Sequence, residues 1–220
     1  MSESMSESID DVAAGSAAGP GSDEERDLLG GRWLTGDTPY GAMIDRLRDF
    51  LDHVAAAKLD DATAQALDAD LAAWTQRLTP MVADEEHRMF GRVRDAPGHG
   101  QVFAPAFIPD QMGDDSLHAR VTFGAFHLGA NYAAHGGAVA LLFDEILGLP
   151  ANMSAQRMAR TAYLHVNYRA ITPIDKELQV SAWVTKVEGR KRFVRGELRD
   201  GDLLCADAEG LFIELLPHQQ

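Results

Sequence analysis

The sequence predicts an α+β fold with one buried helix, a series of strands and a helical N-terminal segment. Residues 138–143 are continuously apolar, and a helix that is apolar on all sides belongs in a protein core. From residue 161 onward, segments of alternating apolar and polar residues are separated by turn signals such as Asp200-Gly201, as expected of half-buried strands. With 220 residues, 45% of them hydrophobic, the chain is long enough for one substantial core plus an appendage.

The first part of the chain is acidic and has little to bury. Residues 1–22 are mainly Ser, Glu, Asp, Ala and Gly, which predicts a disordered tail. Residues 1–99 hold 20 of the 34 acidic residues but only 9 of the 20 basic ones, within a net charge of −14. This acidity argues against nucleic acid as a partner.

Residues 23–83 are predicted to form a helical segment that precedes the main domain, residues 84–220. Apolar residues recur there at spacings of three and four in two runs, the second of which includes Leu67, Leu71, Trp74 and Leu78 and ends at Pro80. We expect an antiparallel helical hairpin. It either caps the main domain, aids oligomerisation or binds a regulatory partner.

Strands are also expected before the central helix. We predict one over residues 101–107, at an edge or a bulge because it contains Pro105. A polar loop should follow over residues 109–116. Residues 118–123 alternate cleanly and predict a half-buried strand with Ala119, Val121 and Phe123 on its apolar face.

The central helix carries the features that point to chemistry. His135-Gly136-Gly137 opens it, Asp144 interrupts its apolar run, and Gly148 and Pro150 are expected to end it. Backbone N–H groups at a helix start lack intrahelical partners, so Gly136 and Gly137 can stabilise a developing oxyanion. Asp144 is either a carboxylate that faces solvent or one that is paired and has a chemical role. If Asp144 does not have that role, the neighbouring Glu145 is the alternative carboxylate.

The spacing of these features predicts a dimer. Asp144 lies seven residues beyond Gly137, or about 10 Å along a helix. A base that activates water must lie within hydrogen-bond reach of that water, which itself stands about 3 Å from the attacked carbon. If both features serve one reaction, they come from two chains that face each other.

Residues 82–216 resemble the PaaI-type hotdog acyl-CoA thioesterases and related members of the thioesterase superfamily. The resemblance rests on His135-Gly136-Gly137 with Asp144, and on segments 161–169, 186–191 and 208–214. It implies a hotdog fold, in which an antiparallel sheet wraps a long helix, and assembly as a homodimer, often a tetramer. It also implies hydrolysis of acyl-CoA, with coenzyme A as part of the substrate and no metal or redox cofactor.

The resemblance also implies roles for individual residues. Asp144 would be the general base, or a nucleophile. The Gly137 N–H, alone or together with that of Gly136, would be the oxyanion donor, and Thr161 would hold the attacking water. His135 either fixes the glycines by hydrogen bonding or polarises the carbonyl. Asn131 is either a loop residue or a substrate contact, and Glu145 would border the substrate.

A basic hairpin tip is the expected coenzyme contact. Arg190, Lys191 and Arg192, which follow Gly189, form with Arg195 the one dense basic group of an acidic chain. Cationic side chains there, with Gly189 at the turn, would attract the phosphates of coenzyme A. The alternative is a tip that is charged only for solubility. Cys205, the single cysteine, excludes an internal disulfide and fits a cytoplasmic location, and no membrane-spanning run or signal peptide is apparent.

Two other functions remain open at this stage. A hotdog enoyl-thioester hydratase or dehydratase would need a histidine and a carboxylate together in its site. A non-catalytic acyl-CoA-binding protein would use the same groove without hydrolysis.

Overall fold

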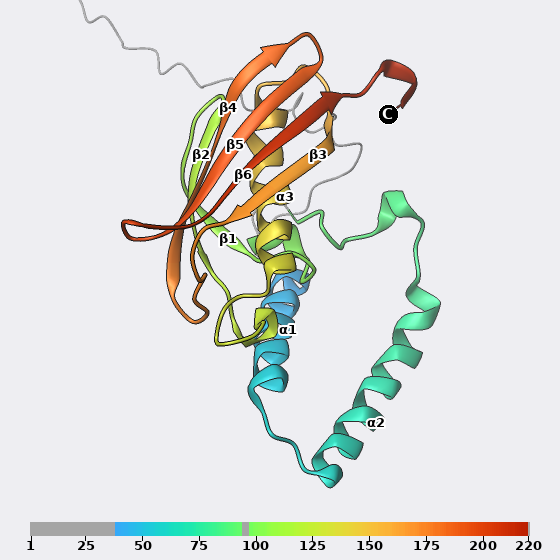
Figure 1. Cartoon of the computed structure of the whole chain (residues 1–220). Coiled ribbons are helices and arrows are strands. Elements are labelled where there is room, and N and C mark those ends of the chain that lie inside the picture. Colours follow the sequence, from blue (N-terminus) through green and yellow to red (C-terminus); the bar gives the residue numbers. More distant parts are fainter. Residues whose placement is uncertain (1–37, 94–96, 220) are drawn as a thin grey trace, which may run out of the picture.

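One antiparallel sheet wraps around a central helix in this computed structural model, which describes residues 38–93 and 97–219 (Figure 1). The strand order is β1-β2-β4-β5-β6-β3. The strands are β1 (Phe107–Met112), β2 (Ser116–Thr122), β3 (Ala159–Tyr168), β4 (Glu177–Glu188), β5 (Lys191–Asp200) and β6 (Leu203–Glu214). The α-helices are α1 (Pro39–Ala56), α2 (Asp61–Leu78) and α3 (Gly136–Met153). The predicted α+β class and hotdog fold are confirmed.

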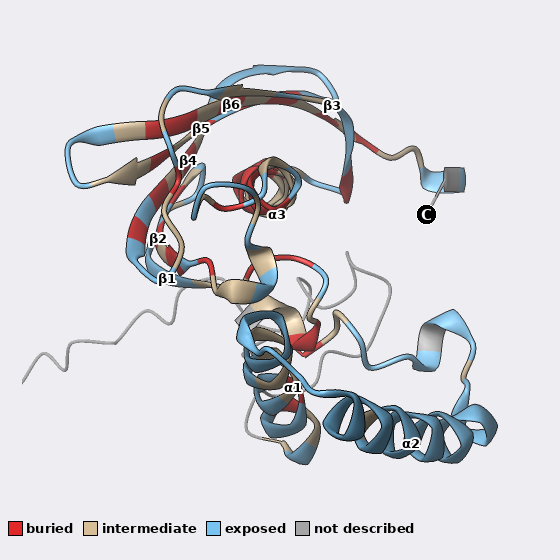
Figure 2. Ribbon diagram, turned by 60° about the horizontal axis from the view of Figure 1, so that its bottom comes forward, coloured by how far each residue is buried: buried red, intermediate tan, exposed pale blue. Residues whose placement is uncertain are grey.

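The core lies between α3 and the concave face of the sheet. Figure 2 shows α3 as a largely buried helix inside the curve of the sheet. Its apolar run fills that space, with Leu142, Phe143, Ile146 and Leu147 fully buried. From the sheet, β2 contributes Leu117, Ala119 and Val121 on alternate positions, as the sequence predicts.

The helix and sheet approach each other closely at Gly196 of β5. A Cβ atom there would lie 2.8 Å from the carbonyl oxygen of Ser181 and 3.3 Å from the ring of Phe143. Only glycine leaves room for Phe143 to rest on the sheet at this point. This contact therefore sets the distance between α3 and the sheet.

The predicted end of the central helix is wrong. Gly148 and Pro150 were expected to stop the helix, but α3 continues through Pro150 to Met153. Pro150 and Ala151 are buried, so tertiary packing outweighs the hydrogen bond that proline cannot make. Asn152 secures this end, because its side-chain amide donates to Gly148 O at 2.8 Å and its oxygen accepts the Ala159 N–H at 2.8 Å.

Two early strand boundaries are also wrong. The strand predicted over residues 101–107 begins only at Phe107, and the first half of the polar loop predicted over residues 109–116 belongs to strand β1. β1 is an edge strand that pairs only with β2, and its register shifts between Pro109 and Gln111. A proline fits there because an edge strand has an unpaired side.

The two predicted N-terminal helices are present, but they do not pack together as a hairpin. Thr38 caps α1 and Asp60 caps α2, each by accepting a backbone N–H. The helices diverge after the short connection between them, and no residue of α2 is buried. The predicted tail, residues 1–22, and the start of the helical segment lie outside the described residues. None of the described helices has the length and apolar character needed to cross a membrane.

Candidate active site

The start of α3 presents one open backbone donor. His135 is the residue that caps the helix, and its Nδ1 accepts the N–H of Gly137 at 3.0 Å. The Gly136 N–H has no acceptor among the described residues. The carbonyl of Gly136 accepts the hydroxyl of Tyr168 at 2.7 Å, which ties the helix start to β3. His135 therefore fixes the glycines, one of the two roles expected for it.

Backbone hydrogen bonds hold this corner in place. The His135 N–H donates to His127 O at 2.7 Å, and the Ala134 N–H donates to Thr172 O at 2.8 Å. Asn131, in the loop before the corner, has a φ of 55° and an exposed side chain. No contact joins Asn131 to the other candidate residues among those described, so its position fits the loop-residue alternative.

α1 supports the same corner from outside the main domain. Asp52 of α1 accepts the backbone N–H of Phe126 at 2.8 Å. His127 packs edge-on against Phe123 and Phe126, with ring centroids 6.0 and 5.4 Å away. Burial lowers the pKa of His127 below its usual value, which favours a neutral ring. The first N-terminal helix thus holds the segment to which His135 is hydrogen-bonded.

Asp144 lies midway along α3 and is paired with Thr161. The Thr161 hydroxyl donates to Asp144 Oδ1 at 2.9 Å, and the carboxylate is half-buried. Its other oxygen has no protein partner among the described residues. Burial raises the pKa of the adjacent Glu145, and the negative charge of Asp144 raises it further. Asp144 is therefore the paired carboxylate that the sequence left as one of two alternatives.

A bulge in β3 aims Thr161 at Asp144. Thr161 pairs with Phe212 of β6, but Tyr163 pairs with Leu211, so Ala162 is an extra residue in β3. Strict alternation would place Thr161 on the face opposite Leu164, which packs on the core. The extra residue turns Thr161 to the same side as Leu164, toward α3. The alternating faces predicted for this strand therefore hold only beyond the bulge.

The open Gly136 N–H and the Asp144 carboxylate do not converge within one chain. Gly136 and Asp144 are separated along α3 by about 12 Å, at about 1.5 Å per residue. The helix is regular between them, so no bend brings the two groups together. The described residues of one chain therefore do not bring the Gly136 N–H and the Asp144 carboxylate to a common point.

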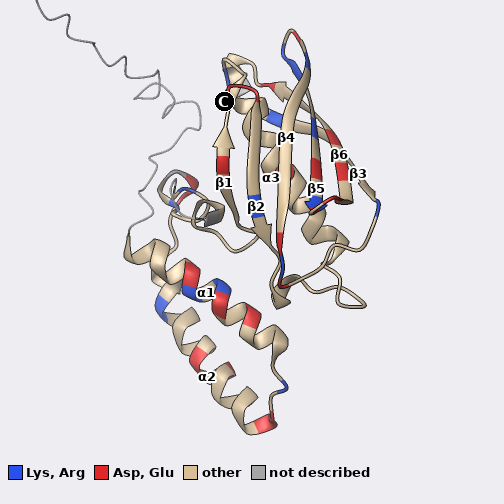
Figure 3. Cartoon of the chain, turned by 90° about the vertical axis from the view of Figure 1, so that its left-hand side faces the viewer, with Lys and Arg blue, Asp and Glu red and all other residues tan. Residues whose placement is uncertain are grey.

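The predicted coenzyme hairpin divides into exposed and buried cations. Figure 3 shows basic residues at the tip of the β4–β5 hairpin, where Gly189 adopts a φ of +56°. Arg190 and Lys191 are exposed, whereas only 5% of Arg192 is accessible. Arg192 is therefore a structural cation and is not available to a phosphate.

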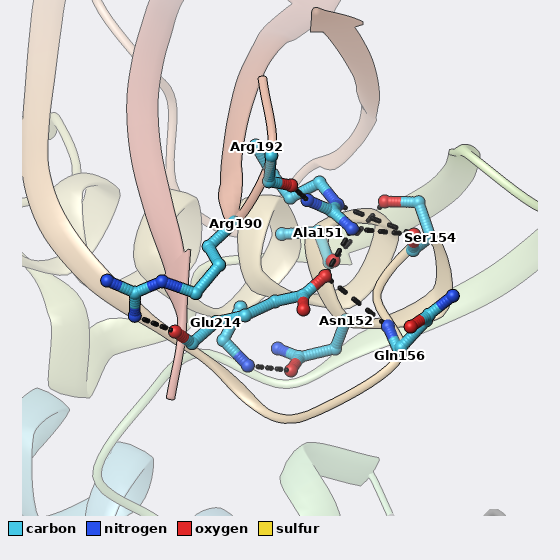
Figure 4. Close-up of polar contacts among 9 residues, drawn as sticks. Ala151, Asn152, Ser154, Gln156, Arg190, Arg192 and Glu214 are labelled. Carbon is cyan, nitrogen blue, oxygen red and sulfur yellow. Dashed lines mark hydrogen bonds and ion pairs between the residues drawn. The ribbon is translucent and has the colours of Figure 1, made fainter. Parts of the chain in front are cut away.

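Arg192 belongs to a buried polar network at the C-terminal end of α3 (Figure 4). It forms an ion pair with Glu214 of β6 and donates to Gly189 O at 2.7 Å and to Ser154 O at 3.3 Å. Glu214 also accepts the N–H of Gln156 at 3.4 Å. We call Arg192 and Glu214 the latch, because they join the β5–β6 strands to the loop between α3 and β3.

Sequence reasoning missed the supporting residues. The latch pair, Tyr168 and Asp52 act on partners between 22 and 74 residues away in the chain. No local spacing signals such contacts. Among the described residues no group of His, Cys, Asp and Glu has the composition and proximity to hold a metal ion.

Comparison with known proteins shows which family the residues around the site resemble. Residues 132–206 match the model of the thioesterase superfamily. Acyl-coenzyme A thioesterase THEM4 of Mus musculus is 34% identical over 99 residues, 44% of this chain and 42% of the mouse protein. THEM4 of Xenopus laevis is 29% identical over 140 residues, 63% of this chain and 61% of the frog protein. The chain thus spans less than two thirds of the length of either relative.

A solved structure supports the fold. The crystal structure of a thioesterase superfamily protein aligns with a TM-score of 0.69 and 23% sequence identity. The alignment covers 83% of this chain and 98% of that protein. At this level of identity the similarity concerns the fold alone.

Proposed function

We propose that this chain, whose residues 132–206 belong to the thioesterase superfamily, hydrolyses acyl-coenzyme A thioesters to the free acid and coenzyme A. The observation that carries the proposal is the hydrogen bond from the Thr161 hydroxyl of β3 to the Asp144 carboxylate of α3. A half-buried carboxylate with one oxygen held and the other open is suited to accept a proton from water. The names of the THEM4 relatives support the same substrate class.

In the proposed reaction, Asp144 acts as general base. It accepts a proton from a water molecule as the water oxygen attacks the thioester carbonyl carbon. Thr161 holds the carboxylate and orients the water. The tetrahedral intermediate then collapses to the acid as the bond from carbon to sulfur breaks. The proton held by Asp144 passes to the sulfur, so coenzyme A leaves as the thiol and Asp144 is again a carboxylate. A direct attack by Asp144, with an anhydride intermediate, is the less favoured route.

Gly136 is the better candidate for the oxyanion donor. The sequence singled out Gly137 first, but the Gly137 N–H is engaged by the imidazole of His135. The Gly136 N–H is open and lies at the positive end of the α3 dipole. In this arrangement His135 serves catalysis by holding Gly137 and the helix start, rather than by polarising the carbonyl itself.

The active sites are proposed to form between two copies of the chain. The separation of about 12 Å between Gly136 and Asp144 along α3 is too great for both to reach one carbonyl carbon. Two chains that face each other would supply the base from one α3 and the oxyanion donor from the other. A homodimer is therefore the smallest active assembly, and a tetramer is compatible with it.

Coenzyme A would be held by the exposed part of the hairpin tip. Lys191 and Arg190 are the cations there that solvent reaches, so they are the proposed phosphate contacts. Arg192 is left out because its guanidinium is committed to the latch. The buried Cys205 is consistent with the cytoplasmic location that we expect.

The alternatives receive less support. A hydratase or dehydratase would pair a histidine with a carboxylate, but His135 is occupied as the helix cap, about 13 Å along α3 from Asp144. A non-catalytic binder would have no need for the Thr161–Asp144 pair. We retain the binder as the outcome to be tested.

Asp144→Asn tests the proposal directly. The variant keeps the shape and removes the basicity, so hydrolysis of a panel of acyl-CoAs, followed with a thiol reagent, should fall by about 10²–10⁴-fold. Folding and coenzyme A binding, measured by calorimetry, should be retained. A wild-type protein that binds acyl-CoA but releases no thiol from any member of the panel would establish the non-catalytic binder instead.

A further inference from the structure

One apolar surface is not explained by the proposed hydrolytic site. Leu71, Trp74 and Leu78 of α2 are 50%, 58% and 56% exposed, and Leu67 continues the same stripe. No residue of α2 is buried, and Figures 1 and 2 show the helix standing away from α3 and the sheet. An apolar stripe that has no partner among residues 38–93 and 97–219 marks an interaction surface.

The spacing within the stripe is that of a helix pair. Leu67, Leu71, Trp74 and Leu78 are separated by four, three and four residues, which places them on one narrow line along α2. This narrow seam differs from the wider apolar face of a helix that packs on a sheet. The stripe is therefore suited to another helix of the same kind.

We propose that α2 pairs with α2 of a second copy of this chain, antiparallel about a two-fold axis between Ala72 and Ala73. In this register Leu71 of each copy packs against Trp74 of the other. Leu67 packs against Leu78 in the same way, because both pairs are centred on the same point. One sequence thus supplies both halves of the interface, as a two-fold contact requires.

The charges beside the stripe favour the same arrangement. Asp70 and Arg77 lie two turns apart on one flank, and Arg77 is held at the stripe edge by its contact of 4.9 Å with the Trp74 ring. A perpendicular two-fold axis brings these flanks together, so that Asp70 faces Arg77 of the second copy twice. Parallel pairing would instead bring Asp68 beside Asp70 of the second copy, which like charges disfavour.

The first test compares two glutamates on opposite faces of α2. Leu71→Glu puts a charge in the stripe, whereas Ala69→Glu puts the same charge on the opposite face and is the matched control. Assembly is measured by sedimentation over a range of protein concentrations. Leu71→Glu should lose the largest assembly or need at least about tenfold more protein to form it, which corresponds to a loss of about 1.4 kcal/mol in the free energy of association. Ala69→Glu should assemble like wild type. Equal assembly of both variants would overturn the proposal.

The second test shows whether the partner of α2 is a second copy of the chain and whether the two helices are antiparallel. Asp70→Lys and Arg77→Glu should each weaken assembly, because each places like charges opposite one another. A mixture of the two single variants, or one chain with both changes, should restore assembly, because Lys and Glu again face each other. Loss in the single variants without restoration would exclude the antiparallel second copy and point to a different partner. Helical content by circular dichroism confirms that α2 is retained.

Hydrolysis of acyl-CoA is measured on the same variants to keep the two proposals separate. α2 contains no residue of the proposed active site, so Leu71→Glu should keep its activity per site at concentrations where the catalytic dimer persists. If the α2 helices do not pair, the proposed role of Asp144 is unaffected. If the wild-type protein hydrolyses no acyl-CoA, the assembly measurement still tests the pairing of α2.

Discussion

Thr161 shows how a residue of ordinary strand type enters a candidate active site. Its hydroxyl reaches Asp144 because one extra residue in β3 turns it toward α3. Threonine is common in strands for its branched shape, so residue type alone does not distinguish a structural role from a chemical one. The contact with Asp144 makes the hydroxyl, rather than the methyl group, the feature to test.

Thr161→Val should lower kcat while Thr161→Ser retains it. Valine keeps the shape but removes the hydroxyl, and a hydrogen bond to a charged group contributes about 1.5–3 kcal/mol. We therefore expect a loss of about tenfold or more in kcat with little change in KM, measured by thiol release. A valine variant as active as the serine variant would show that Thr161 is only a strand residue.

Glu145 should make stability depend on pH. Burial and the adjacent Asp144 raise its pKa in the folded state above the ordinary value of 4.5. The folded state therefore binds this proton more tightly, so the stability linked to Glu145 is fully present below about pH 4.5 and lost as pH rises through the raised pKa. Glu145→Gln should raise Tm at pH 7 but not at pH 4. Asp114→Asn, at an exposed carboxylate, is the control, and equal effects at both pH values would contradict the prediction.

At the scale of elements, the β4–β5 hairpin combines two roles that the sequence presents as one basic cluster. Arg192 points inward to Glu214 and Ser154, whereas Lys191 points to solvent. The alternation of a strand separates neighbouring cations onto opposite faces. Replacing the whole cluster would therefore confuse a loss of folding with a loss of coenzyme binding.

Arg192→Ala and Lys191→Ala should have opposite signatures. Removing Arg192 leaves Glu214 buried without its cation, which costs about 3–5 kcal/mol of stability. Removing Lys191 should leave Tm unchanged, raise KM for acyl-CoA and weaken its dependence on salt. Thermal denaturation and steady-state kinetics of the two variants measure both effects. An unchanged KM in Lys191→Ala would indicate that the charge of the hairpin tip serves only solubility.

At the scale of the whole molecule, the separation of Gly136 from Asp144 predicts that activity requires two chains. Two inactive variants test this: Asp144→Asn and a Gly136 replacement bulky enough to block close approach to its N–H. After joint unfolding and refolding in equal amounts, each mixed dimer would have one intact site and one doubly mutated site. Activity should return toward about a quarter of wild type if chains assort at random. Mixed dimers confirmed by mass but without activity would place both groups in one chain.

The sequence by itself determined the parts of this protein that depend on local pattern. The apolar run before Asp144 identified the core helix, and alternation identified the later strands. Apolar residues at spacings of three and four identified α1 and α2. These features are encoded within a few turns or a single strand, so the order of residues is enough to reveal them. The motif from His135 to Asp144 likewise pointed to the thioesterase superfamily, whose model matches residues 132–206.

The tertiary structure decided whatever depends on residues far apart in the chain. It extended α3 through Pro150 because burial of the last turn outweighs a missing hydrogen bond. It turned Thr161 toward Asp144 through a bulge that only the pairing with β6 reveals. It buried Arg192 in an ion pair with Glu214, and left α2 without a partner in the part of the chain that the structure describes. Each outcome reflects packing or pairing between segments that no local pattern relates, which is why the sequence could not determine it.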